Sequence, residues 1–284
     1  MPMIDADGCL LNVSVDGRDD EPTLMLSNSL GCTLEMWEPQ MKTLTQLFRV
    51  IRYDRRGHGK SQVPSGPYSM ERFGWDVLAI LDALNIRKTH WCGLSMGGMV
   101  GQWLGANAPE RFDRIILANT ACYYPDPTNW LDRIKAVNEG GLVLVADMIL
   151  AGWLSADFRQ REPLVAARMK AMLLATPVQG YVACCEALST LDQRELLPRI
   201  KSKTLVIAGR HDNATPVSAA ELIRSRIPNA SMKILNAAHI SNVEQADAFT
   251  DAVVGFLTST LKVSRVTSFS YPRPPAYDQR PIEG

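Results

Sequence analysis

Short runs rich in β-forming residues alternate with segments of helical periodicity along most of this chain. This alternation is typical of a mainly parallel sheet covered by helices on both faces. The runs predicted to be strands are residues 11–15, 23–27, 48–53, 89–93, 114–119, 204–208 and 232–235. Between two of these runs, Ser69 is placed to cap an amphipathic helix whose apolar face would cover the sheet. The sequence therefore predicts an α/β fold.

The alternation fails between residues 123 and 200, where the sequence is typical of helices and contains no convincing strand. An all-helical insertion between two strands would lie over the strand C-termini, where open α/β sheets bind their ligands. We therefore predict a core of residues 1–122 and 201–261 with a helical lid of residues 123–200. The alternative is that these helices merely extend the core. Residues 262–284 place prolines among polar residues, which predicts a disordered tail or a remnant added for expression.

Charge, apolar runs and cysteine spacing exclude several kinds of partner and location for this protein. Thirty basic and thirty acidic residues cancel, so no broad surface should attract nucleic acid or an anionic membrane. The N-terminal residues lack the pattern of a secretory signal. The longest apolar run, 141–154, is too short to span a membrane and is interpreted as a buried helix. The six cysteines show no metal-ligand spacing, which favours a cytoplasmic protein with reduced thiols and no metal site.

The string Gly93-Leu94-Ser95-Met96-Gly97 follows a predicted strand and directly precedes a helix. A turn this tight puts the serine in a strained backbone conformation and needs neighbours that are almost free of side chains. The same turn would expose the serine hydroxyl at the edge of the sheet, which predicts Ser95 as a nucleophile. A glycine-rich turn with an incidental serine is the alternative.

A serine hydroxyl needs a positioned base, and four histidines are available. His90 lies inside the strand before the serine and is more simply a packed core residue, while His58 lies in a glycine-rich loop. His211 directly precedes an acidic residue. His239 follows the last predicted strand through a short turn, where the chain order serine, acid, histidine places the base. We therefore predict His239 as the base.

The base in turn needs an acid that fixes its tautomer and stabilises the imidazolium. Asp212 lies at the C-terminal tip of the strand that precedes the histidine strand, so we predict Asp212 as the acid. Glu244 and Asp247 belong to the closing helix and are interpreted as solvated surface. The oxyanion hole should use the backbone N–H groups of Met96 and Leu30, each typically worth about 3 kcal/mol in the transition state.

Taken together, these strings resemble the 3-oxoadipate enol-lactonases of the α/β-hydrolase superfamily over about residues 5–261. The most telling parts are Ser27-Asn28-Ser29-Leu30-Gly31 with Met36-Trp37, residues 93–99, and the lid string 175–181. The strings around Ser95, Asp212 and His239 are shared by many esterases and support only the superfamily. Cys32 stands where that family is expected to have threonine.

The resemblance implies hydrolysis of 3-oxoadipate enol-lactone, a small lactone bearing one carboxylate, in protocatechuate and catechol breakdown. Ser95 would attack the lactone carbonyl while His239 takes its proton, without metal or organic cofactor. Two other classes stay open: another carboxylesterase or lactonase, such as an acyl-homoserine lactonase, and a non-catalytic ligand receptor on the same fold. The oligomeric state also stays open.

A carboxylate-bearing lactone would benefit from a cation under the lid. Arg133, with Trp130 nearby, is a plausible supplier, and Trp153 is a second aromatic side chain of the lid. The alternatives are that Arg133 is an ordinary surface residue and that Trp153 only packs.

Overall fold

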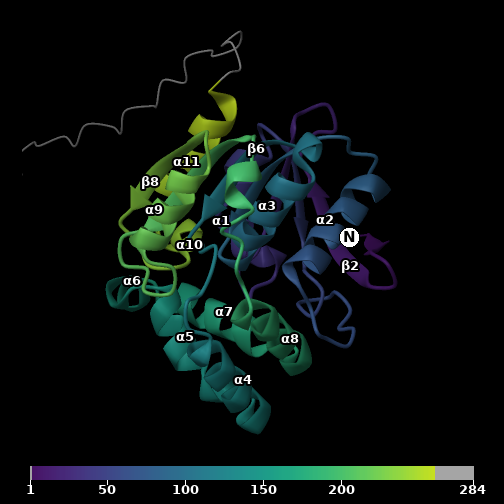
Figure 1. Ribbon diagram of the computed structural model, residues 1–284. Coiled ribbons are helices and arrows are strands. Elements are labelled where there is room, and N and C mark those ends of the chain that lie inside the picture. The colour runs from purple at the N-terminus through teal and green to yellow at the C-terminus, as the bar shows by residue number, and fades with distance from the viewer. Residues whose placement is uncertain (1, 260–284) are drawn as a thin grey trace, which may run out of the picture.

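The computed structural model of the protein describes residues 2–259, and within them eight strands form one twisted sheet (Figure 1). The strand order is β1-β2-β4-β3-β5-β6-β7-β8, and all neighbours from β4 to β8 pair in parallel. The strands are β1 (Met3–Asp5), β2 (Leu10–Asp16), β3 (Thr23–Ser27), β4 (Arg49–Tyr53), β5 (Thr89–Leu94), β6 (Phe112–Ala118), β7 (Lys203–Gly209) and β8 (Ala230–Leu235). The predicted α/β fold with a mainly parallel sheet is confirmed.

Every strand predicted from the sequence is present, with ends displaced by at most two residues. The sequence analysis missed β1, which has three residues and pairs antiparallel with β2 at the edge of the sheet. A strand this short offers too few residues for an alternating pattern to stand out.

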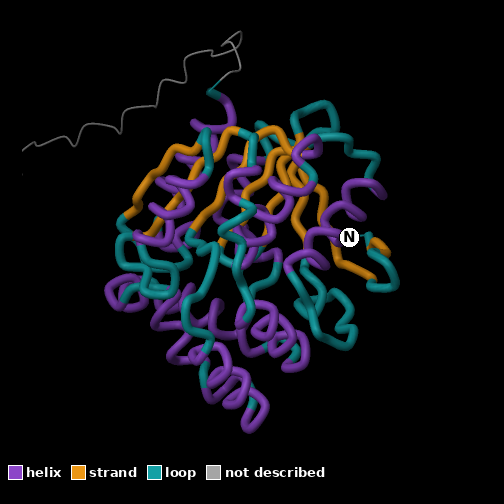
Figure 2. Tube along the Cα trace, viewed as in Figure 1, coloured by secondary structure: helices purple, strands orange, loops and turns teal. Residues whose placement is uncertain are grey.

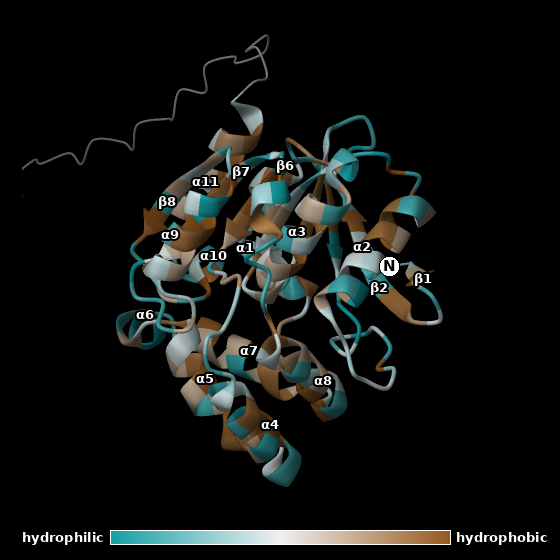
Figure 3. Ribbon diagram, in the orientation of Figure 1, coloured by the Kyte–Doolittle hydropathy of each residue, from teal (hydrophilic) through white to brown (hydrophobic). Residues whose placement is uncertain are grey.

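Helices lie on both sides of the sheet, so that the strands run between them (Figure 2). The helices outside residues 123–200 are α1 (Glu38–Leu44), α2 (Met70–Ala83), α3 (Met96–Asn107), α9 (Val217–Arg226), α10 (Ser241–Glu244) and α11 (Ala246–Thr258), with 3-10 turns η1 (Leu34–Trp37) and η2 (Pro109–Arg111). The predicted cap of α2 is confirmed, because the Ser69 hydroxyl accepts a hydrogen bond from the Arg72 N–H at 3.0 Å. The strands are mostly apolar, whereas the covering helices carry both apolar and polar residues (Figure 3).

A group of helices is inserted between β6 and β7 and lies beyond one end of the sheet (Figure 1). This helical insertion contains α4 (Thr128–Gly140), η3 (Leu142–Leu144), α5 (Ala146–Trp153), α6 (Ala156–Arg161), α7 (Pro163–Leu174), α8 (Val178–Ser189) and η4 (Leu197–Arg199). Its elements fall inside residues 123–200, while the exact limits of core and lid stay a prediction. The predicted tail, 262–284, lies outside the described residues.

The apolar run 141–154 is less buried than its sequence suggested. It forms η3 and α5, in which Ile149 and Leu150 are buried but Val143, Leu144 and Met148 are exposed. The interpretation of this run as one buried helix is therefore wrong in part, because only one side of it packs against the insertion. Among residues 2–259 no single helix is long and apolar enough to cross a membrane. One pair bent by 90°, Pro163–Leu174 with Val178–Ser189, passes that test by length and composition alone.

Candidate active site

Ser95 lies at the turn where β5 ends and α3 begins, with backbone angles φ 56° and ψ −116°. A positive φ is strained for a residue with a side chain and persists only where the surroundings enforce it. A side chain at position 93 would meet the backbone oxygen of Gly97, and one at position 97 would meet that of Ser27. The glycines of the motif are thus required by the close approach of α3 to the sheet.

His239 follows β8, and its Nδ1 lies 2.8 Å from Oδ2 of Asp212, which follows β7. Both side chains are almost fully buried. Two backbone N–H groups, of Ala214 and Thr215, donate to Oδ1 of Asp212 at 2.9 Å, and the Thr215 hydroxyl donates to Oδ2 at 2.7 Å. Burial alone would raise the pKa of Asp212. The charge and hydrogen bond of His239, together with the bonds from Thr215, outweigh burial and lower that pKa to about 2. The carboxylate is therefore charged and held in one orientation.

Ser95 and His239 line one cavity of about 610 Å³ between the strand ends and the helical insertion. Its other lining residues include Leu30 of the loop after β3, Trp130 and Arg133 of α4, and Trp153 of α5. Its volume suits a small organic molecule. The structure thus brings the predicted nucleophile, base and substrate-binding residues to the same space, with Asp212 behind His239.

The three other histidines lie elsewhere, and none of them lines this cavity. His90 lies within β5, with Nδ1 3.6 Å from Asp113. His211 is exposed and pairs with Asn236 at 2.9 Å. His58 is fully buried, and its Nε2 accepts a hydrogen bond from the Gly31 N–H at 2.9 Å. Their positions leave His239 as the histidine that shares a cavity with Ser95.

The loop after β3 is arranged to leave one N–H group free. The Gly31 N–H is engaged by His58, whereas the Leu30 N–H has no hydrogen-bond partner among residues 2–259. The carbonyl of Asn28 accepts from Nη2 of Arg55 at 2.6 Å and from the Gly97 N–H at 3.1 Å, which ties this loop to α3. Met96 is the first residue of α3, where a backbone N–H has no partner within the helix. Both predicted oxyanion donors are thus available beside Ser95.

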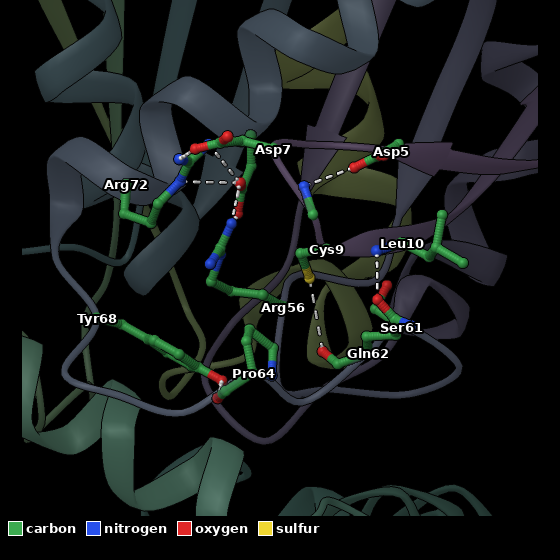
Figure 4. A network of polar contacts seen from close by, with 12 residues as sticks. Asp5, Asp7, Cys9, Leu10, Arg56, Ser61, Gln62, Pro64, Tyr68 and Arg72 are labelled. Atoms are coloured by element: carbon green, nitrogen blue, oxygen red, sulfur yellow. Dashed lines mark hydrogen bonds and ion pairs between the residues drawn. The ribbon is translucent and has the colours of Figure 1, made fainter.

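The loop that carries His58 is itself bonded to the N-terminal segment of the chain through Gln62, whose contacts are drawn in Figure 4. Gln62, in the loop that carries His58, accepts a hydrogen bond from the Leu10 N–H at 2.8 Å, and its carbonyl lies 3.8 Å from Sγ of Cys9. Burial and the charge of Arg55 lower the pKa of His58 to about 3, so His58 is a neutral acceptor. By accepting the hydrogen bond of the Gly31 N–H, His58 fixes the loop that carries Leu30.

Arg133 is half-buried, with its guanidinium 4.9 Å from the centre of the Trp130 ring. Within residues 2–259 it forms no ion pair, and its Nε is buried without a hydrogen-bond partner. Burial raises the pKa of Tyr124 and of Tyr181, two phenols that line the same cavity. The charge of Arg133 opposes that rise in both, and in Tyr181 a side-chain hydrogen bond with Arg133 opposes it too. The cavity thus holds a cation that stacks on an aromatic ring and, within the described residues, forms no ion pair even with Asp132, which lines the same cavity.

Residues 22–246 match the model of the alpha/beta hydrolase fold family. The chain belongs to this family.

Relatives of this α/β-hydrolase agree with the resemblance found in its sequence. The chain is 41% identical to 3-oxoadipate enol-lactonase 2 of Acinetobacter baylyi, over 86% of this chain and 91% of that protein. The crystal structure of the enol-lactonase from Burkholderia xenovorans LB400 superposes with a TM-score of 0.89 and 42% identity, covering 90% of this chain and all of that one. A hydrolase from Pseudomonas aeruginosa PA01 superposes with a TM-score of 0.87 and 44% identity, over 90% and 97% of the two chains.

Sequence analysis missed several polar residues around the α/β-hydrolase site, among them Asn119, whose side-chain amide donates to Oδ2 of Asp212 at 3.0 Å. Thr215 binds the Asp212 carboxylate through both its N–H and its hydroxyl, and its place three residues after the aspartate was the available signal. The interpretation of Glu244 as solvated surface is wrong, because its side chain is buried and accepts two backbone N–H groups. Asp247 is exposed, as expected.

Proposed function

We propose that this chain hydrolyses 3-oxoadipate enol-lactone to 3-oxoadipate in the cytoplasmic breakdown of aromatic compounds. The observation that carries the proposal is 41% identity to a 3-oxoadipate enol-lactonase along nearly its whole length. Arg133 supports it, because this cation lines the cavity of Ser95 without an ion pair and the substrate carries one carboxylate that needs a partner.

Ser95 is the nucleophile of the proposed mechanism. Its hydroxyl attacks the lactone carbonyl carbon while Nε2 of His239 takes the proton, and Asp212 holds Nδ1 of the same ring. The backbone N–H groups of Leu30 and Met96 stabilise the negative charge on the carbonyl oxygen.

The ring C–O bond then breaks, and the enol oxygen takes the proton from His239. This leaving group stays tethered within the acyl-enzyme and becomes a ketone, which discourages reclosure of the ring. His239 next removes a proton from water, which attacks the acyl carbon and releases Ser95 with its proton restored. One water is consumed for each lactone, and no cofactor takes part.

Arg133 is the proposed partner of the substrate carboxylate. Trp130 holds its guanidinium from one side, and Trp153 forms an apolar wall of the same cavity. A neutral lactone or ester would leave this cation unpaired, so the cavity should favour the charged substrate.

A comparison of substrates tests the proposal. We expect kcat/KM for 3-oxoadipate enol-lactone to exceed that for a neutral aryl ester and for an acyl-homoserine lactone by about a hundredfold or more, because a site built to pair a polar group rejects analogues that lack it. A higher value for the acyl-homoserine lactone would favour a different lactonase. No turnover of any ester would point to a receptor. Growth on protocatechuate with and without the gene tests the pathway.

A further inference from the structure

Glu244 is a buried carboxylate that the proposed mechanism does not use. It is the last residue of α10, and its side chain lies between the catalytic core and the helical insertion. Its Oε2 accepts a hydrogen bond from the Ala238 N–H at 3.0 Å and another from the Ser155 N–H at 3.1 Å. Ala238 directly precedes His239, and Ser155 caps α6 of the insertion. One oxygen atom therefore joins the loop of the proposed base to the insertion.

The peptide units around Ala238 are held from opposite sides. Its N–H donates to Glu244, while its carbonyl accepts from Nδ2 of Asn119 at 3.2 Å. The same Asn119 nitrogen donates to Oδ2 of Asp212 at 3.0 Å. The position of Ala238 thus bears directly on how His239 faces Asp212, and Glu244 joins Ala238 to the insertion.

A second contact lies beside the first. The Ile240 N–H donates to the carbonyl of Trp153 at 2.9 Å, and Trp153 lines the cavity. The end of α5 and the start of α6 are therefore attached to the residues on either side of His239. Displacement of this part of the insertion would pull on the loop of the base.

We propose that Glu244 is a positioning residue that couples the position of α5 and α6 against the core to the orientation of His239. The inference rests on the proposed role of His239 as base. A single carboxylate oxygen accepts both hydrogen bonds, so the two N–H groups share one acceptor. If the insertion moves so that the Ser155 N–H no longer donates to Oε2 of Glu244, this oxygen can shift. The hydrogen bond from the Ala238 N–H to the same oxygen then changes as well.

Substitutions of Glu244 test its effect on catalysis. Glu244→Leu leaves both N–H groups without an acceptor and should lower kcat for a small neutral ester by about tenfold to a hundredfold with KM nearly unchanged, since a misplacement of about 1 Å can have that effect. Glu244→Gln retains an acceptor oxygen and should recover most of kcat. Asp247→Asn, which removes an exposed carboxylate from the next helix, should behave like the parent. Equal kcat values for the leucine, glutamine and parent proteins would overturn the proposal.

Ser155 offers a matched pair that tests the coupling from the insertion and leaves Glu244 intact. Its φ of −60° and the extended conformation of Leu154 both suit proline, so Ser155→Pro removes the N–H with little change of backbone. Ser155→Ala is the control, because both variants lose the hydroxyl that accepts from the Phe158 N–H but the alanine keeps the Ser155 N–H. The difference between the two variants reports the contact with Glu244.

We expect Ser155→Pro to accelerate amide hydrogen exchange at Ala238 and to lower kcat relative to Ser155→Ala. Equal exchange at Ala238 and equal kcat in both variants would refute the coupling, even if Glu244→Leu fails to fold. The exchange measurement needs no substrate. A parent that hydrolyses no ester would therefore defeat the proposed function without deciding the coupling, which the exchange at Ala238 decides separately.

Discussion

At the scale of single residues, the candidate triad owes its geometry to groups outside it. Ser95 is held at a positive φ by a turn that only small neighbours allow. Asp212 is held by Thr215 and Ala214, which occupy the Oδ1 lone pairs and leave Oδ2 facing His239. The Ser95 backbone and the Asp212–His239 pair are therefore fixed before a substrate binds, and such preorganisation is what positional catalysis requires.

Replacement of the nucleophile is the first prediction. Ser95→Ala should lower kcat by several orders of magnitude, because no acyl-enzyme can form, while the protein stays folded. Mass spectrometry after treatment with a serine-directed phosphonate should locate the adduct on Ser95 in the parent. An adduct on another residue would exclude this mechanism.

The pH dependence of kcat/KM tests the base. Since His239 must be neutral to take the serine proton, kcat/KM should fall on acidification through one ionisation. The His239→Ala variant should lose nearly all activity. His90→Ala, which changes a histidine of β5 away from the cavity, should keep the same acid limb. Substantial activity in His239→Ala would move the role of base to another histidine.

At the scale of elements, the helical insertion supplies what the sheet lacks. The strand ends carry the proposed nucleophile, base and acid, whereas α4 carries the proposed carboxylate partner, Arg133, and α5 an aromatic wall of the cavity. We expect substrate choice to depend on the insertion and bond cleavage on the core.

Arg133→Met tests this division of roles. A charge-assisted contact of a partly buried guanidinium is worth about 1.5–3 kcal/mol, so kcat/KM for the carboxylate-bearing lactone should fall roughly ten- to a hundredfold. A neutral ester of similar size should be hydrolysed as well as by the parent, because the triad is untouched. Both substrates are compared by kcat/KM, since the loss can enter either constant.

Lys135→Met is the matched control for this change, because it removes an exposed cation from the same helix. It should leave both substrates unaffected. Equal losses on the two substrates in Arg133→Met would mean that Arg133 supports the fold of the insertion. No loss on either substrate would assign the carboxylate to another residue.

At the scale of the whole molecule, buried ionisable groups set the acid stability. The folded protein holds the pKa of His58 at about 3, below its ordinary value of 6.5, because of burial and the charge of Arg55. As pH falls from 6.5 toward 3, the unfolded chain takes up a proton that the folded protein does not. The free energy of unfolding therefore decreases over that range, by at most about 1.4 kcal/mol per pH unit for this one group. Asp212 stabilises the fold above pH 3.8, its ordinary pKa. That contribution is lost only at lower pH, as the pH falls from 3.8 to about 2, the pKa in the folded protein.

His58→Gln should flatten the dependence of stability on pH. Glutamine cannot take up the proton and still offers an acceptor to the Gly31 N–H. Urea unfolding at pH 7, 6, 5 and 4 should show the free energy of unfolding of the variant falling less steeply than that of the parent. Parallel curves for the two proteins would show that His58 does not cause the decrease in the free energy of unfolding at low pH.

Local patterns in the sequence were enough for the strands and the nucleophile turn. The alternation of apolar residues depends only on neighbouring positions. The glycines around Ser95 are likewise required by the backbone conformation of the same few residues. The order of Ser95, Asp212 and His239 along the chain was sufficient to choose the acid and base. The sequence analysis missed β1 because it has only three residues. It missed the exposed side of residues 141–154 because Val143, Leu144 and Met148 are apolar although exposed, so the run shows no polar face.

The sequence by itself determined the type of fold, the positions of seven of the eight strands of the sheet and the residues of the candidate triad. Only the tertiary structure decided which distant groups meet. It placed Arg133 against Trp130 in the cavity of Ser95, paired His58 with the Gly31 N–H, and buried Glu244 between Ala238 and Ser155. The physical reason is that secondary structure follows from periodicity over a few residues, whereas the burial of a charge depends on segments that only folding brings together.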